Sequence, residues 1–217
     1  MTYKEFLDKY RDQIDSGDFK NPLFEGFYGS NLWKDLMTNL IKLGVNPLVG
    51  FNKVPSYFFS DSKIGSIVIP DSVTSIEYYA FLNCTKLTNV TIPDSVKSIE
   101  WGAFQNCISL TSITIPSNVT NIGYQAFSGC SSLTSIVIPD GVTGIEGYEF
   151  SGCSSLTRIT IPDSVTVIEH YAFYDCSSLT SIYYKGTKQQ FMAIKKGGSW
   201  KPEPLIEIKC SDGVIKI

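Results

Sequence analysis

The most constraining feature of this 217-residue sequence is a repeat of 23 residues that runs through most of its length. Prolines recur at this spacing in one column, and cysteines recur in another. The two columns are Pro70, Pro93, Pro116, Pro139, Pro162 and Cys84, Cys107, Cys130, Cys153, Cys176. A unit of this size cannot bury its own apolar face and must stack on its neighbours. The period therefore predicts a solenoid of stacked coils.

Apolar columns share the same period and predict which side chains point inward. They consist of Val73, Ile76, Phe81 and Leu87 with their equivalents in the following four repeats. Within one unit, Leu110, Ile113 and Ile115 alternate with Ser112 and Thr114, as expected of a short parallel strand with one buried face. The recurring proline has no N–H to donate and would end each strand.

One strand per repeat predicts a single parallel sheet along the solenoid. Its six strands are expected to centre on Ile67, Val90, Ile113, Ile136, Ile159 and Ile182. At roughly 4.7–4.9 Å per strand, the sheet would be about 25–30 Å long. After each strand the chain must turn, and Ala126, Phe127 and Cys130 fit one face of a single helical turn that closes the coil.

The unit from Leu110 to Ser132, LTSITIPSNVTNIGYQAFSGCSS, resembles the BspA-like leucine-rich repeat known in bacterial and protozoan surface proteins. The match is close from Ile64 to Tyr184. It extends more weakly back to Phe51, where the period places Phe58 in the phenylalanine column and Asp61 in the cysteine column. The resemblance implies a leucine-rich-repeat solenoid, an α/β repeat with parallel strands stacked in right-handed coils.

Three parts are expected along the chain: a helical N-terminal cap over 1–50, about six coils over 51–184 with a degenerate first coil, and a C-terminal cap over 185–217. Caps are required because the terminal coils would otherwise expose apolar faces. In the N-terminal cap, two helices are predicted. The first has helically spaced Tyr3, Phe6, Leu7, Tyr10 and Ile14; the second begins after Ser30 and ends at Gly44.

The C-terminal cap is predicted to contain a helix and a hairpin. Thr187 and Gln190 have the spacing of a capping box, which would start a short helix reaching about Lys195. The pair Asp212 and Gly213 predicts a hairpin between the segments 206–210 and 214–217. This region also resembles the terminal cap common in BspA-like proteins.

One residue departs from the core pattern. Glu149 occupies the column of Ala80, Ala103, Ala126 and Ala172, where an unpaired carboxylate would cost several kcal/mol. We therefore expect a local distortion in which the turn rotates enough to hydrate or pair Glu149. Tolerated drift of one repeat is an alternative to a functional role.

The residues indicate no catalytic, metal or cofactor chemistry. His170 is the only histidine and has no nucleophile motif beside it, and the sequence has no phosphate loop and no paired-cysteine zinc signature. The five cysteines of the column are interpreted as small buried residues, while Cys210 has no assigned role. No catalytic residue, metal ligand or cofactor is predicted.

Composition bears on partners and location. The net charge is −3 and 43% of residues are hydrophobic, so a basic surface for nucleic acid is not expected. No apolar run is long enough for a membrane span. The start, MTYKEFLDKY, lacks the pattern of a secretory signal. The expected location is cytoplasmic or associated with a virion or other assembly, and the cell surface or secretion if the chain is truncated.

Two surfaces remain for a partner. On the outer strand face, Arg158 and Tyr183 are the only large groups, and their small neighbours are interpreted as good strand formers rather than as a specific site. The second surface precedes each Ala-Phe pair, beside a column of glutamates. Its candidate residues are Tyr78, Tyr79, Trp101, Tyr124, Tyr148, His170 and Tyr171. These side chains either bind a partner or merely cover the turn.

The leading functional hypothesis is a non-enzymatic protein-interaction module, of the adhesion or host-contact type that the resemblance implies. An alternative is a structural or accessory component of a larger assembly, such as a phage particle. A third is carbohydrate binding, because flat aromatic rings stack on sugars. Oligomeric state is not predicted.

Overall fold

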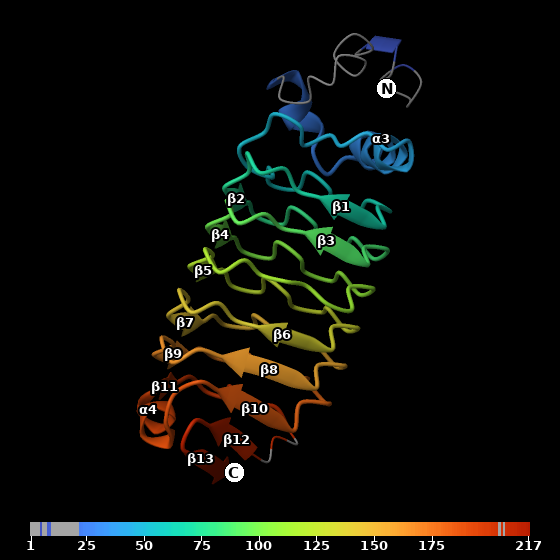
Figure 1. Ribbon diagram of the computed structural model, residues 1–217. Coiled ribbons are helices and arrows are strands. Elements are labelled where there is room, and N and C mark those ends of the chain that lie inside the picture. Colours follow the sequence, from blue (N-terminus) through green and yellow to red (C-terminus); the bar gives the residue numbers. More distant parts are fainter. Residues whose placement is uncertain (1–4, 6–7, 10–21, 204, 206) are drawn as a thin grey trace.

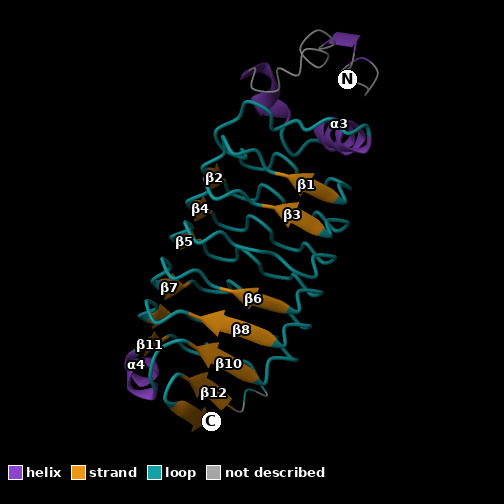
Figure 2. Cartoon of the chain, viewed as in Figure 1, coloured by secondary structure: helices purple, strands orange, loops and turns teal. Residues whose placement is uncertain are grey.

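The computed structural model describes residues 5, 8–9, 22–203, 205 and 207–217, and shows a solenoid whose coils stack along one axis (Figure 1). Most coils contribute two short strands, and Figure 2 shows them as two columns joined by loops. The first column holds β1 (Ser66–Val68), β3 (Asn89–Thr91), β6 (Ser135–Val137), β8 (Arg158–Ile161) and β10 (Ser181–Tyr184). The second holds β2 (Ser75–Ile76), β4 (Ser98–Ile99), β5 (Asn121–Ile122), β7 (Gly144–Ile145) and β9 (Val167–Ile168).

Strand register follows the sequence period. Ser66 pairs with Asn89 and Ile76 pairs with Ile99, in parallel ladders. Leu110, Ile113 and Ile115 are buried while Ser112 and Thr114 are exposed, so the predicted alternation is confirmed. The solenoid with stacked parallel strands is confirmed. The second strand of each coil was not predicted from the sequence.

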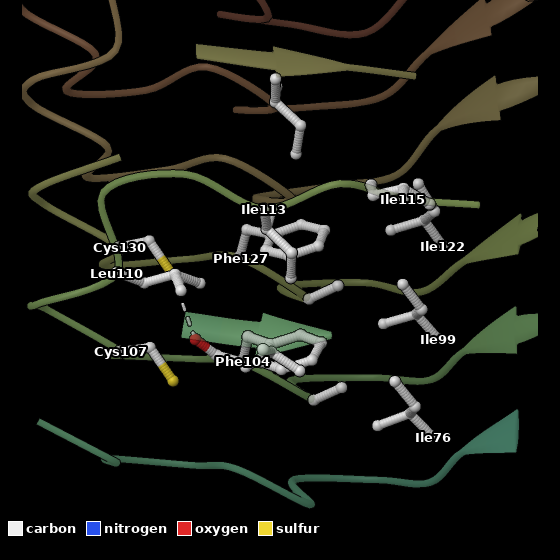
Figure 3. Packing of buried hydrophobic residues seen from close by; sticks show 14 of the residues in the cluster. Ile76, Ile99, Phe104, Cys107, Leu110, Ile113, Ile115, Ile122, Phe127 and Cys130 are labelled. Carbon is white, nitrogen blue, oxygen red and sulfur yellow. Dashed lines mark hydrogen bonds between the residues drawn. The ribbon is translucent and has the colours of Figure 1, made fainter. Parts of the chain in front are cut away.

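Identical side chains stack on one another in the core (Figure 3). The rings of Phe81 and Phe104 lie 5.0 Å apart and are nearly parallel. The Cys130 thiol donates to the carbonyl oxygen of Phe104 in the preceding coil at 3.2 Å, and burial raises its pKa to about 12. Every cysteine of the column is buried and makes this same contact, so their interpretation as small buried residues is confirmed.

The expected helical turn around the Ala-Phe pair is wrong. The chain instead makes successive tight turns, in which the Ala80 N–H bonds to the Glu77 carbonyl and the Cys84 N–H to the Phe81 carbonyl. Tyr79 and Asn83 have φ values of 55° and 56°. A residue in the left-handed region cannot belong to a right-handed helix, so each turn ends before a helix can propagate.

The single sheet expected through all coils is also wrong, because both columns of strands are interrupted (Figure 1). In the first column β1 pairs only with β3, and the next coil has one isolated bridge between Ser112 and Ser135 where a strand centred on Ile113 was predicted. In the second column, β5 pairs with β4 but not with β7. The central coil, which contains β5, therefore has strand pairing to the preceding coil only in the second column and to the following coil only in the first column.

Glu149 lies beside the second interruption. Of the two outcomes expected for it, hydration is wrong, and pairing holds for one carboxyl oxygen. The side chain is fully buried. Its Oε2 accepts the backbone N–H of Glu146 at 2.8 Å, while Oε1 has no hydrogen-bond partner among the described residues. The equivalent N–H groups of Glu100 and Glu169 instead bond to the carbonyl of the preceding coil. The turn thus does not rotate Glu149 toward solvent. Instead, the Glu146 N–H gives up its bond to the preceding coil and donates to one carboxyl oxygen of Glu149.

The first coil is one residue shorter than expected. Phe59, not Phe58, stacks on Phe81 at 5.1 Å, and the buried Ser62, not Asp61, contacts the Cys84 sulfur. The segment between the cysteine and leucine columns has lost a residue here, so the earlier part of the coil shifts by one position. Phe58 instead packs against the N-terminal cap.

Among the residues that can be described, the N-terminal end contains η1 (Pro22–Phe27) and α3 (Asn31–Lys42). Ser30 caps α3 by accepting the Trp33 N–H, and Gly44 follows the helix with φ 77°, both as predicted. Trp33 is fully buried and donates from Nε1 to the Phe58 carbonyl at 2.7 Å. The first predicted helix, with Tyr3, Phe6, Leu7, Tyr10 and Ile14, lies outside the described residues.

The C-terminal end contains α4 (Lys188–Ala193), β11 (Lys195–Lys196), β12 (Glu207–Cys210) and β13 (Gly213–Lys216). The capping box of Thr187 and Gln190 and the hairpin across Asp212 and Gly213 are confirmed. The helix ends at Ala193, two residues before its expected limit, because β11 pairs with β9. Since β12 also pairs with β10, this end continues both columns of strands.

Candidate functional site

The structure joins most of the predicted aromatic residues into one chain of rings across successive coils. We call this surface the aromatic strip. Neighbouring ring centroids lie 4.9 to 6.2 Å apart. In order, the strip consists of Tyr57, Tyr79, Trp101, Tyr124, Tyr148, Tyr171 and Tyr174. Five of these seven were candidates from the sequence.

The remaining candidates of this surface lie beside the strip. Tyr78 is exposed, and in the described structure its ring is not part of the aromatic strip. His170 precedes Tyr171, and its Nδ1 accepts the N–H of Gly198 at 2.8 Å. This bond places the proton of a neutral imidazole on Nε2.

Sequence reasoning missed both ends of the strip. Tyr57 aligns with Tyr79 only after the one-residue shift of the first coil is known, because the 23-residue period places it opposite Ala80. Tyr174 follows Phe173 at a position where other coils have Leu82, Gln105, Ser128 and Ser151, so no column marks it. An irregular repeat length and an irregular position concealed the two residues.

Apart from Tyr174, the rings of the strip come from two adjacent positions of the repeat, and Gly102 makes room where the strip changes from one position to the other. Gly102 aligns with Tyr79, and a Cβ atom there would lie 2.4 Å from the Tyr79 ring. Any larger residue at Gly102 would displace that ring. The ring of Trp101 from the same coil continues the chain and is 44% exposed.

A column of half-buried glutamates runs beside the strip: Glu77, Glu100, Glu146 and Glu169. The Glu77 carboxylate accepts the Ser75 hydroxyl at 2.6 Å. Burial raises the pKa of Glu146, and the neighbouring charge of Glu169 raises it further. Burial also raises the pKa of the Tyr148 phenol, which therefore stays neutral at physiological pH.

Besides a hollow of about 470 Å³ beside Tyr174, two hollows open along this surface. The smaller has a volume of about 220 Å³ and is lined by Tyr124, Glu146, Gly147, Tyr148, Glu169 and His170. The larger, of about 670 Å³, lies at the first coil, and its lining includes Tyr28, Phe51, Lys53 and Tyr57. Because Tyr57 is the first ring of the strip, the strip begins at the larger hollow and passes the smaller one.

The two candidates on the strand face form a separate cluster. The Arg158 guanidinium lies 4.4 Å from the centre of the Tyr183 ring, and the Lys209 ammonium lies 4.9 Å from the same centre. Lys209 also donates to the Tyr183 hydroxyl at 3.3 Å and pairs with Glu207. This cluster joins only β8, β10 and β12, whereas the strip crosses six successive coils.

Within the described residues, no group of three or more His, Cys, Asp or Glu side chains is arranged to hold a metal ion. Among the helices that can be described, none is long and apolar enough to cross a membrane.

Comparison with known proteins agrees with this architecture. The family model described as the BspA type leucine rich repeat region matches residues 52–189 with six copies. A search of curated proteins found no match. Among solved structures, the T. pallidum leucine rich repeat protein shares 29% identity with this chain at a TM-score of 0.53. The pneumococcal vaccine antigen PcpA is similar in fold, with 20% identity and a TM-score of 0.53.

These alignments cover part of each protein. The T. pallidum match spans 66% of this chain and 62% of that one, and the PcpA match spans 68% and 37%. The family model, in contrast, covers every coil from the first degenerate repeat to the start of α4. With its period, its stacked columns and this match, the chain belongs to the BspA-type leucine-rich-repeat family.

Proposed function

We propose that this chain is a non-enzymatic protein-interaction module that binds its partner along the aromatic strip. The observation that supports this most is the continuity of the ring chain, from Tyr57 to Tyr174, beside a column of carboxylates. Leucine-rich-repeat proteins generally act as binding scaffolds, since stacked repeats create extended surfaces.

The geometry of the strip suits recognition of a protein surface. Tyrosine and tryptophan give a large contact area with few rotatable bonds, and residues of this kind dominate binding energies. Each ring already contacts the next, as Trp101 does with Tyr124 at 5.1 Å. Because the rings are held by one another, little side-chain entropy is lost when a partner binds.

The test uses the intact chain to retain proteins from lysate and surface fractions of its source and of the corresponding host. The matched pair of variants changes either the strip, Trp101→Ala/Tyr124→Ala, or the strand face, Thr114→Ala/Val137→Ala. We expect a retained protein that the strip variant loses and the strand-face variant keeps. Equal retention by both variants would exclude the strip as the binding site.

An adhesion or host-contact role is the more specific form of this proposal, and it rests on the family resemblance. It requires that the partner be a surface component of another cell. Binding of the purified chain to intact host cells, with loss in the strip variant, would support it. A partner found only inside the source cell would contradict it.

Carbohydrate binding is a second candidate, favoured by the half-exposed indole of Trp101 at the middle of the strip. A glycan array would show binding that disappears with Trp101→Ala. Glycan binding that survives this change would place the sugar elsewhere.

A further inference from the structure

The smaller hollow lies where three successive coils meet at the strip. Tyr124 comes from one coil, Glu146, Gly147 and Tyr148 from the next, and Glu169 and His170 from the third. The rings of Tyr124 and Tyr148 are 5.7 Å apart with an angle of 63° between their planes. The hollow therefore has a mainly apolar lining in a volume of about 220 Å³, with Glu146 and Glu169 among its lining residues.

Gly147 explains why the hollow is found in this coil. In the other coils its position holds Tyr78, Trp101, Tyr124 and His170, all with ring side chains. A Cβ atom at Gly147 would lie 3.0 Å from the Tyr124 ring and 3.4 Å from the His170 carbonyl oxygen. Its φ is not positive, so the backbone does not require glycine here. What glycine provides is space between Tyr124 and His170.

The charges in the hollow are unbalanced. Glu146 and Glu169 occupy the same column in adjacent coils, and the charge of Glu169 disfavours ionisation of Glu146. Among the described lysines and arginines, none forms an ion pair with either carboxylate. The imidazole of His170 accepts the Gly198 N–H and also lines the hollow. A cation would relieve the repulsion between the two carboxylates.

We propose that this hollow receives a lysine or arginine side chain of the protein partner. The inference rests on the proposed function and specifies the chemistry of the partner at one point of the strip. The rings of Tyr124 and Tyr148 would stabilise the cation through their faces, and Glu146 and Glu169 would pair with it. A basic side chain presents both the apolar stem and the charged head that such walls require.

Other occupants fit less well. An apolar side chain would fill the mainly apolar hollow but would leave the charges of Glu146 and Glu169 unbalanced. An acidic side chain would add a third negative charge. The larger hollow at the first coil differs in chemistry, because Lys53 is the only charged residue in its described lining. The two hollows therefore favour opposite charges.

The test titrates the full chain with Nα-acetyl-lysine methylamide and the corresponding arginine compound, followed by the amide resonances of Gly147 and Tyr148. Nα-acetyl-norleucine methylamide, which keeps the stem but lacks the ammonium group, is the control probe. We expect saturable shifts with the two basic probes and none with norleucine. Equal shifts from all three probes, or none from the basic probes at their solubility limit, would overturn the proposal.

Two variants locate the binding. Glu146→Gln/Glu169→Gln should weaken binding of the basic probes about ten-fold or more, the effect of losing charge-assisted hydrogen bonds. Glu77→Gln/Glu100→Gln removes two charges from the same column in earlier coils and should leave binding unchanged. An equal loss in both variants would indicate general electrostatic attraction and contradict a defined site.

The outcomes also separate this inference from the proposed function. If the strip variant loses the retained partner but basic probes do not bind at Gly147, the interaction module stands and the basic side chain is rejected. If basic probes bind at Gly147 but strip and strand-face variants retain partners equally, the hollow stands and the strip is rejected.

Discussion

At the scale of single residues, each column of the repeat can be understood from the contact that its member makes with the preceding coil. The cysteine column requires a small buried group that can donate to a carbonyl, as Cys107 does to Phe81 at 3.2 Å. Ser62 takes this place in the first coil. The alanine column holds a small group in four coils, and Glu149 departs from it with a carboxyl group that is fully buried.

Glu149→Ala is expected to stabilise the solenoid. The buried Oε1 lacks a hydrogen-bond partner in the described structure, and leaving such a group unsatisfied costs about 1–3 kcal/mol. Alanine at this position also frees the Glu146 N–H to bond to the preceding coil, as Glu100 does. Urea denaturation at neutral pH should show a higher free energy of unfolding. A lower value would mean that the carboxyl group fills space that alanine leaves empty.

The same residue predicts a pH dependence. Burial raises the pKa of Glu149 well above its ordinary value of 4.5, so the folded state binds this proton more tightly than the unfolded state. The stabilisation is complete below pH 4.5 and is lost as pH rises toward the folded-state pKa. Glu149→Gln keeps the shape but cannot ionise. The variant should gain stability over wild type as pH rises above 4.5, and parallel pH profiles would argue against this assignment.

The core residues could be predicted from the sequence because one apolar column corresponds to one buried position. The environment of Glu149 could not, since the pattern showed a charged residue in an apolar column but not how the backbone would respond. Whether a buried carboxyl group finds a hydrogen-bond donor depends on whether a nearby backbone N–H can give up its bond to the preceding coil. In this coil, the Glu146 N–H does so.

At the scale of one element, the coil from Leu133 to Ser155 contains several departures from the repeat, and they coincide with the interruption between β5 and β7. In other coils, serines such as Ser95 and Ser164 donate to a carbonyl of the preceding coil at 2.6 Å. Gly141 occupies this column and has no hydroxyl group to donate. The coil therefore lacks both the hydroxyl bond at Gly141 and the bond from the Glu146 N–H to the preceding coil. These two losses account for the interruption between β5 and β7.

This interruption predicts a weakly protected amide at Thr143. The equivalent amides of Thr120 and Thr166 donate to Lys97 and Thr143 of their preceding coils, both at 2.9 Å. The Thr143 N–H donates to no carbonyl among the described residues. We therefore expect its hydrogen exchange, followed by nuclear magnetic resonance, to be faster than that of Thr120 and Thr166. Equal protection of all three amides would show that the ladder is continuous in solution.

The elements were only partly predictable. Strands of the first column have three or four residues and alternate visibly, whereas those of the second have two, too few for any alternation to appear. The left-handed residues of the turns were missed because Tyr79, Gln125 and Tyr148 are not glycines. The interruption at the coil of Ile113 has no explanation in its own sequence. For the strip, the period identified the five central rings, while the first-coil shift hid Tyr57.

At the scale of the whole molecule, each coil is stabilised by contacts with its two neighbours. The two terminal coils lack one neighbour, so the chain ends must cover their apolar faces. The C-terminal hairpin covers β10 through β12, where Ile208 is fully buried. At the other end, Trp33 lies 5.1 Å from the Phe58 ring, and Phe58 contacts Phe59, the first ring of the phenylalanine stack. Trp33 is thus connected to the continuous core through two aromatic contacts.

The last prediction compares the same substitution at two tryptophans. Trp33→Ala removes a fully buried ring and its 2.7 Å hydrogen bond to the Phe58 carbonyl, and should lower the free energy of unfolding by about 3–5 kcal/mol. Trp101→Ala removes a half-exposed ring of the strip and should cost about 1 kcal/mol or less. Chemical denaturation of both variants, followed by circular dichroism, measures the difference. If the two losses are equal, the N-terminal end does not close the solenoid; if Trp101→Ala is the more damaging, the strip supports the fold, and loss of partner binding in its variants would no longer report on recognition alone.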